Sequence, residues 1–158
     1  MQIVANKELH LLNVISLRKK MTQIELGKES QNIKKLFDEN NLSVKSITSV
    51  TYSVTKGQDE KPLLDIELLV EGVANKIPDI SLAEYVVKPE IKIVNALYVD
   101  YEGSAREIQT AYNTINAYIA EHKLQPITPA YSVSQNPFTS KPESVCMEIY
   151  VGISPNVT

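Results

Sequence analysis

The sequence contains two copies of one unit, about 82 residues apart, and this duplication constrains the fold more than any other feature. Six identical pairs share one offset with no gap between them, namely Glu8 and Glu90, Asn13 and Asn95, Glu25 and Glu107, Ile33 and Ile115, Glu39 and Glu121, and Leu42 and Leu124. After a short deletion, Tyr52-Ser53-Val54 matches Tyr131-Ser132-Val133, and Glu67 matches Glu148. An internal repeat predicts that the two halves share one supersecondary structure.

Each copy has the residue pattern of a strand, a helix and two further strands. β-Branched and apolar residues predict first strands at 9–17 and 91–101. In the second copy, Ser104 and Glu107 have the spacing of a capping box that would begin the helix. The apolar stripe of that helix consists of Ile108, Ala111, Tyr112, Ile115, Tyr118 and Ile119. In the first copy, Asn40-Asn41 is expected to end the helix.

The last strand of the second copy alternates strictly between apolar and other residues. Every odd position of 145–153 is apolar, so this face is expected to pack on a core. The opposite face carries Cys146, Glu148, Tyr150 and Gly152. In the first copy, the expected inward residues are Ile66, Leu68 and Val70, and the opposite face carries Asp65, Glu67, Leu69 and Glu71.

These patterns predict an α+β fold. Two tandem β-α-β-β repeats would form a mainly antiparallel sheet, with two helices on one face and a cleft on the other. Residues 1–158 are expected to form a single domain of two repeats, approximately 1–75 and 83–158, because one repeat alone would have a half-sized core. The segment 74–84 is the expected linker.

Composition excludes several classes of protein. The net charge of −3 argues against a dedicated nucleic-acid binder, which needs surplus positive charge to neutralise phosphates. No apolar run approaches the ~20 residues that span a bilayer, and the sequence starts with no signal-peptide pattern. A cytoplasmic location and no membrane association are therefore expected.

Few residues offer catalytic or metal chemistry. The single cysteine, Cys146, excludes an internal disulfide and a thiolate zinc cluster. His10 and His122 have no metal-ligand spacing and are interpreted as surface or structural residues. The five glycines are too widely spaced for a phosphate-binding loop. The sequence predicts no metal and no cofactor.

Glu67 and Glu148 are the most informative carboxylates, because they occupy equivalent mid-strand positions on the face turned away from the core. Two interpretations remain open. Each glutamate could be an ordinary charge on a solvated sheet face, or it could lie at the base of a cleft between the repeats. A partly desolvated carboxylate beside tyrosines would favour a lipophilic cation.

Three stretches resemble the GyrI-like small-molecule-binding family, which includes effector-binding domains of multidrug-responsive bacterial regulators. They are Val99-Asp100-Tyr101-Glu102-Gly103-Ser104 at a strand end, Asn136-Pro137-Phe138-Thr139 with Lys141-Pro142-Glu143 in a loop, and Met147-Glu148-Ile149-Tyr150-Val151 in the closing strand. The resemblance implies that Glu148 contacts a cationic ligand. The chain is also similar to uncharacterised proteins of about 150 residues from Gram-positive bacteria that share this plan, some encoded near specialised-secretion toxin clusters.

The leading hypothesis is a stand-alone GyrI-like domain that binds a cationic or amphipathic small molecule in the inter-repeat cleft. Glu148 would supply the counter-charge, with Tyr98, Tyr101 and Tyr150 as walls and Glu67 as a second candidate. The alternative is a non-enzymatic interaction or adaptor protein that acts through a protein partner or as a homodimer. A third hypothesis is a hydrolase in which a glutamate is the base and Tyr150 its partner, although no second acid or base is identifiable. The protein is therefore expected not to be an enzyme.

Overall fold

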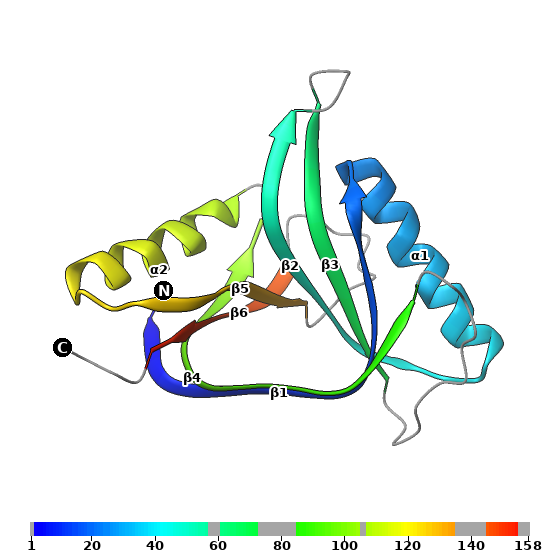
Figure 1. The fold of residues 1–158 in the computed structure, drawn as a ribbon, viewed down its shortest axis with the longest axis horizontal. Helices are drawn as coiled ribbons and strands as arrows, with labels where there is room; N and C mark the ends of the chain where they lie inside the picture. Colours follow the sequence, from blue (N-terminus) through cyan, green and yellow to red (C-terminus); the bar gives the residue numbers. More distant parts are fainter. Residues whose placement is uncertain (1, 57–60, 73–84, 105–106, 135–144, 155–158) are drawn as a thin grey trace. The chain divides into compact units, whose positions relative to one another are not determined.

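The structure is a computed structural model that describes residues 2–56, 61–72, 85–104, 107–134 and 145–154. Its elements follow the predicted order of strand, helix, strand, strand in each half (Figure 1). They are β1 (Ile3–Met21), α1 (Gln23–Glu39), β2 (Val44–Lys56), β3 (Pro62–Gly72), β4 (Val86–Gly103), α2 (Gln109–Glu121), β5 (Pro126–Ser134) and β6 (Val145–Ile153). The predicted linker at 74–84 and the loop at 136–143 lie outside the described residues.

The chain divides into two compact units that do not coincide with the two sequence repeats. Unit 2 is Leu11–Ile91, and unit 1 combines Met1–His10 with Lys92–Thr158. The first strand of each repeat therefore contributes residues to both units. β1 and β4 are correspondingly longer than the segments 9–17 and 91–101 predicted from sequence.

Both units have the same strand order and the same antiparallel pairing, which confirms the predicted α+β fold. In unit 2, β3 lies between β1 and β2, and in unit 1, β6 lies between β4 and β5. The register also repeats, because Arg18 pairs with Glu67 in unit 2 as Asp100 pairs with Glu148 in unit 1. Glu67 and Glu148 are thus structural equivalents, as the sequence repeat predicted.

The register corrects one part of the sequence alignment between the repeats. Tyr131 pairs with Tyr150, and the equivalent of Tyr150 in unit 2 is Leu69, which pairs with Thr48. The structural equivalent of Tyr131 is therefore Thr48 and not Tyr52. The matching Tyr-Ser-Val triplets misled the sequence comparison because three residues can match by chance at a shifted register.

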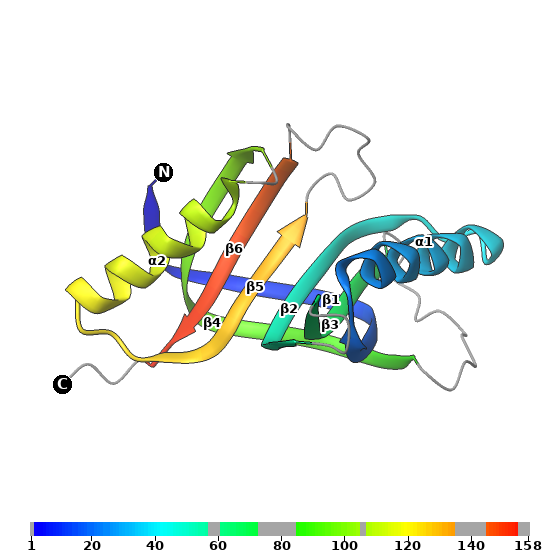
Figure 2. The same cartoon turned by 90° about the horizontal axis from the view of Figure 1, so that it is seen from above.

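The core of unit 1 lies between α2 and one face of its strands (Figure 2). All six residues of the predicted helical stripe belong to this core or pack against it, as do all five apolar residues of β6. The period-2 pattern of β6 and the period-3.6 pattern of α2 thus identified the two sides of one interface.

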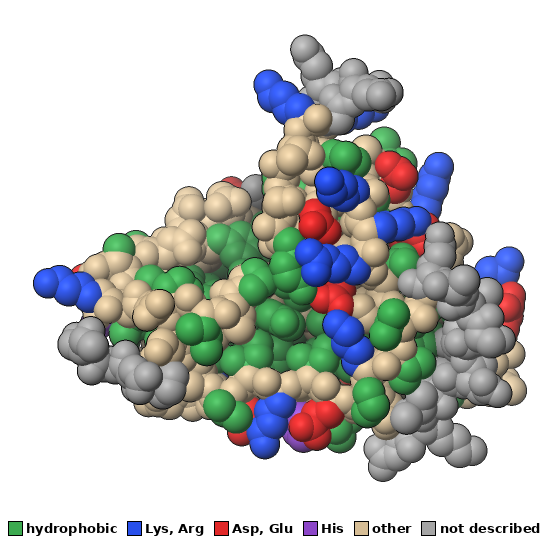
Figure 3. Space-filling view, in the orientation of Figure 1, with side chains coloured by type: hydrophobic (Ala, Val, Ile, Leu, Met, Phe, Trp, Pro, Cys, Tyr) green, Lys and Arg blue, Asp and Glu red, His purple; other side chains and the backbone are tan. Residues whose placement is uncertain are grey.

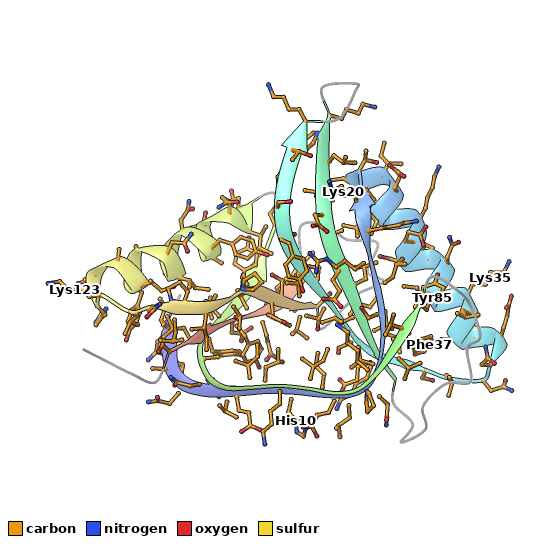
Figure 4. The ribbon with its side chains drawn as sticks, in the orientation of Figure 1. His10, Lys20, Lys35, Phe37, Tyr85 and Lys123 are labelled. Atoms are coloured by element: carbon orange, nitrogen blue, oxygen red, sulfur yellow. The ribbon has the colours of Figure 1, made fainter. Side chains whose placement is uncertain are left out.

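In unit 2, α1 packs against β3 (Figure 1). Ile33 and Phe37 on α1 have no exposed surface, and Phe37, labelled in Figure 4, lies beside Gly72 of β3. Asn40 caps the helix and Asn41 adopts a φ of 57°, so the predicted end of this helix is confirmed. Asparagine is one of the few residues other than glycine that adopts this conformation readily.

The predicted capping box at the start of the second helix is wrong. α2 begins at Gln109, and its N-cap residue Ile108 makes no side-chain capping bond. A capping box is instead present at the equivalent place in the first copy, where the amide of Glu25 donates to Thr22 Oγ1 (3.3 Å) and the amide of Thr22 donates to Glu25 Oε1 (3.2 Å). The same motif therefore caps one helix and not its equivalent.

We expect Thr22→Ala to lower the free energy of unfolding by about 1 kcal/mol, since an N-cap hydroxyl satisfies an amide that has no partner inside the helix. Ser30→Ala is the matched control, because the Ser30 hydroxyl donates to the carbonyl of Leu26 within the same helix. Urea denaturation measures both variants. Equal stability of the two would show that the capping box contributes nothing.

Candidate functional site

Glu148 lies in the middle of β6, on the face of the unit 1 strands that is turned away from α2. Its cross-strand neighbour on β4 is Asp100, and the next pair along is Tyr98 with Tyr150. On β5, Tyr131 pairs with Tyr150. Directly paired residues share a face, so a row of three tyrosines lies beside a row of two carboxylates. We call these five residues the tyrosine–carboxylate face.

The contacts within this face connect the aromatic and acidic rows. The hydroxyl of Tyr150 donates a hydrogen bond to Glu148 Oε2 over 2.7 Å. The rings of Tyr98 and Tyr150 are 5.1 Å apart between centroids and are tilted by 54°. The ammonium of Lys7 lies 5.1 Å from the centroid of the Tyr98 ring, within range of a cation–π interaction. One aromatic ring of the face therefore already contacts a cation from the chain itself.

Burial and the neighbouring carboxylates raise the pKa of Tyr98 and of Tyr150. Burial, followed by the hydrogen bond to Glu148, raises the pKa of Tyr150 well above its ordinary value. Burial, followed by the charges of Glu148 and Asp100, also raises the pKa of Tyr98. The two phenols consequently remain hydrogen-bond donors with neutral rings across the physiological range.

The carboxylates of this face have no positive partner within the described part of the chain. Glu148 is half-buried and Asp100 is exposed, and among the described residues neither forms an ion pair. Two negative charges directly opposite each other on adjacent strands repel, and a cation placed between them would relieve that repulsion. This arrangement can hold an organic cation with aromatic rings on one side and carboxylates on the other.

Tyr101 does not belong to this face, contrary to the sequence prediction. It is 6% exposed, lies in the core cluster with Leu97 and Val99, and its hydroxyl donates to the carbonyl of Ser104. Side chains alternate along a strand, so Tyr98 and Asp100 point one way and Tyr101 the other. The alternation of apolar residues along β4 was the signal that could have excluded Tyr101.

Glu67 lies in unit 2 and is only 4% exposed, so the interpretation of an ordinary solvated glutamate is wrong for this residue. Its carboxylate accepts hydrogen bonds from Lys88 Nζ (2.6 Å), the Tyr52 hydroxyl (2.7 Å) and the Ser16 hydroxyl. Basic and acidic side chains alternate over the strands of this unit (Figure 3). The Arg18 guanidinium stacks on the ring of Tyr52, with its Cζ atom 3.7 Å from the ring centroid. Glu67 is thus fully satisfied by its own chain.

Burial by itself would raise the pKa of the Glu67 carboxyl, but the hydrogen bonds from Lys88, Ser16 and Tyr52 outweigh burial and lower it below the ordinary value. A carboxylate held in this way stays ionised in the folded protein at a pH where the unfolded chain takes up a proton. Glu67 therefore stabilises the fold above the pKa of the unfolded state.

From this shift we expect the free energy of unfolding to fall as the pH is lowered from about 5 through the folded pKa of Glu67. Urea denaturation between pH 7 and pH 3 measures the loss. Glu67→Gln should be less stable than the wild type at pH 7 and should lose less stability on acidification. Parallel curves for the two proteins would contradict the assignment.

Sequence reasoning missed several residues of these arrangements, including Ser16 and Tyr52, whose hydroxyls donate to Glu67. Asp100 and Tyr131 join the tyrosine–carboxylate face through cross-strand register, and Lys88 reaches Glu67 from a strand of the other repeat. The predicted cleft between the repeats remains a prediction. Within unit 1, a cavity of about 290 Å³ is lined by Ala5, Asn6, Asn95, Ala96, Leu97, Leu124, Ile153 and Ser154, none of which was a predicted site residue.

Neither histidine takes part in these arrangements. His10 is exposed on β1 (Figure 4), and His122 caps the end of α2 and stacks on Tyr118 with ring centroids 4.0 Å apart. Within the described residues, no group of three or more histidine, cysteine or acidic side chains could hold a metal ion. No helix in this part of the chain combines the length and apolar character that crossing a membrane requires.

Comparison with solved structures identifies the fold. The chain superposes on the C-terminal domain of EcmrR with a TM-score of 0.63 and 15% identity, covering 97% of each chain. It matches EcmrR in an EcmrR–DNA complex with a TM-score of 0.72 and 13% identity, covering 97% of this chain and 57% of that one. A hydrolase from Listeria innocua matches with a TM-score of 0.56 and 9% identity, covering 97% of this chain and 91% of that one.

These similarities establish the fold. The chain shares it with the C-terminal domain of EcmrR, and spans a little over half of the EcmrR chain in the DNA complex. The sequence matches no family model, and no curated protein matches it. The chain thus belongs, by fold, with duplicated β-α-β-β domains.

Proposed function

We propose that this protein is a GyrI-like domain that binds a cationic or amphipathic small molecule at the tyrosine–carboxylate face. One observation carries the proposal: Glu148 and Asp100 are direct cross-strand neighbours, lie beside Tyr98 and Tyr150, and form no ion pair among the described residues. The fold shared with the C-terminal domain of EcmrR supports this function.

The chemistry of the face defines the class of ligand. Aromatic rings attract a delocalised or alkylated cation, and two nearby carboxylates supply the counter-charge. A small hydrophilic cation would gain little from the tyrosine rings. The expected ligand is therefore a flat or lipophilic organic cation of drug-like size, for which rhodamine 6G and tetraphenylphosphonium are suitable probes.

We expect a bound lipophilic cation to raise the melting temperature of the wild type and to have little effect on Glu148→Gln. At 100 times its dissociation constant a ligand contributes about 2.7 kcal/mol, which corresponds to a shift of about 5–10 °C for a chain of this size. A thermal-shift titration with both probes measures the effect. The amide retains the shape of Glu148 and removes its charge.

Glu121→Gln is the control for a general loss of negative charge, since Glu121 is an exposed residue at the end of α2. This variant should respond to the probes as the wild type does. Equal shifts in the wild type, Glu148→Gln and Glu121→Gln would mean that the cations bind elsewhere. No shift in any of the three would contradict a cation site at this face.

A hydrolase is the second candidate, favoured by the hydrogen bond between Tyr150 and Glu148 and by the fold shared with a Listeria innocua hydrolase. The raised pKa of Tyr150 argues for binding, because a phenol that holds its proton so firmly is a poor acid. Ester hydrolysis that depends on both Glu148 and Tyr150 would favour the enzyme instead.

For partners, we propose that the chain itself makes no contact with DNA, since its net charge is −3. The DNA complex of EcmrR involves a longer chain, of which this one spans 57%. A DNA-binding regulator could still be the protein partner through which ligand binding is read out. Co-purification with and without a cationic probe would test whether a partner depends on the ligand.

A further inference from the structure

The two equivalent glutamates have opposite surroundings, and this contrast points to a second site. On the tyrosine–carboxylate face, Glu148 is opposite another acid, Asp100. In unit 2, Glu67 is opposite Arg18 and is bonded to Lys88. Among the described residues, Glu148 therefore has no cationic partner, whereas Glu67 is paired with the Lys88 ammonium.

The Lys88 ammonium makes a close contact with the Glu67 carboxylate. Its Nζ lies 2.6 Å from Glu67 Oε2, the shortest of the ion-pair distances among the described residues. The Glu67 side chain is 5% exposed and the Lys88 side chain 40%. The carboxylate is therefore buried, whereas the lysine that pairs with it is in contact with solvent. Tyr52 and Ser16 hold the same carboxylate in place.

The repeat explains why only one unit is filled in this way. At the offset of 82 residues that relates β1 to β4, the equivalent of Lys88 is Asn6. Asparagine has no charge and cannot pair with a glutamate as an ammonium does. The two copies therefore differ at two positions that change the charge around the glutamate, with Lys88 and Arg18 in unit 2 where the equivalent residues are Asn6 and Asp100.

We infer that unit 2 contains a second ammonium-binding site, built on Glu67, Ser16 and Tyr52, which Lys88 occupies as a tethered ligand. Its chemical class is a primary alkylammonium, since a compact group with N–H donors fits a carboxylate that already accepts two hydroxyl bonds. This site is built on Glu67 and does not depend on ligand binding at Glu148.

The test removes the tethered ligand and supplies it in solution. Lys88→Ala deletes three carbons and the nitrogen, and n-propylammonium has the same atoms. We expect n-propylammonium chloride to raise the melting temperature of Lys88→Ala by about 5–10 °C at 100 times its dissociation constant. Tetramethylammonium chloride, which has no N–H donor, should not do so at the same concentration.

Matched variants separate a site from a general salt effect. Lys92→Ala removes an exposed lysine whose ammonium is 3.8 Å from the exposed Glu8, and it should show no rescue. Lys88→Met should show none either, because its side chain fills the space that the probe needs. Equal shifts in Lys88→Ala and Lys92→Ala, or no shift in Lys88→Ala, would overturn the inference.

Two further measurements keep the inference falsifiable. If Lys88→Ala does not fold unaided, n-propylammonium is expected to restore its folded circular-dichroism spectrum, and failure to restore it counts against the site. Lys88→Ala/Glu148→Gln should be rescued as well as Lys88→Ala. Loss of rescue in this double variant would place the probe at Glu148 and refute the second site while leaving the proposed function intact.

Discussion

We expect Lys88→Met to lower the free energy of unfolding by about 2–4 kcal/mol at pH 7. The variant leaves the Glu67 carboxylate, whose side chain is 5% exposed, without its counter-charge. Removing one partner of a fully buried ion pair costs about 3–5 kcal/mol, and the 40% exposure of Lys88 reduces that value because water reaches the vacated side. Urea denaturation measures the difference from the wild type.

The double variant Glu67→Gln/Lys88→Met identifies the cause of this loss. It removes both charges and should recover most of the stability, because the penalty comes from an uncompensated buried carboxylate. Lys92→Met is the surface control, and its pair with Glu8 should contribute less than about 1 kcal/mol. A Lys88→Met protein as stable as Lys92→Met would show that the Glu67 pair contributes no more than a surface pair.

We expect Gly152→Val to lower the free energy of unfolding by about 2–3 kcal/mol, through overpacking. A Cβ atom at Gly152 would lie 2.8 Å from Thr128 Cγ2 and 3.2 Å from Ile93 Cγ2. The amide of Gly152 also donates to Thr128 Oγ1, which holds that side chain against the glycine. Denaturation in urea measures the variant.

Thr128→Ala should partly rescue Gly152→Val, since it removes the atom in closest contact. Gly27→Ala in α1 is the opposite control, because a Cβ there would meet nothing within 4 Å. The free energy of unfolding of Gly27→Ala should increase by about 0.5–1 kcal/mol, because alanine is the better helix former. A Gly152→Val protein as stable as the wild type would contradict the close packing of β5 on β6.

The fold could be predicted because its signals are local or repeated. The alternation along β6 and the apolar stripe on α2 each identify the buried face of an element, and these two faces pack together in one core. The sequence repeat then predicted the same elements in the first copy, where the helical pattern is weaker. The helix starts could not be predicted equally well, because Thr22 and Ser104 precede the same kind of motif, yet Thr22 is the N-cap of α1 whereas the N-cap of α2 is Ile108.

The candidate sites were less predictable because they depend on cross-strand register. Glu148, Tyr150 and Tyr98 were identified from sequence, and the structure brings all three together. Asp100 joins them only because β4 and β6 pair in one register and no other. Lys88 and Glu67 are 21 residues apart and belong to different repeats, so no local pattern connects them.

The composition of the two units has a consequence for the order in which the chain folds during synthesis. Unit 2 is one continuous stretch, Leu11–Ile91, so all of its residues have left the ribosome before the second repeat is complete. Unit 1 needs Met1–His10 together with Lys92–Thr158, so its two segments are separated along the chain by the whole of unit 2. Domains form as their residues emerge, and contacts between distant segments form slowly. The Glu67 ion pair can therefore form while the tyrosine–carboxylate face is still incomplete, because Glu148 lies on β6, which follows every residue of unit 2 along the chain.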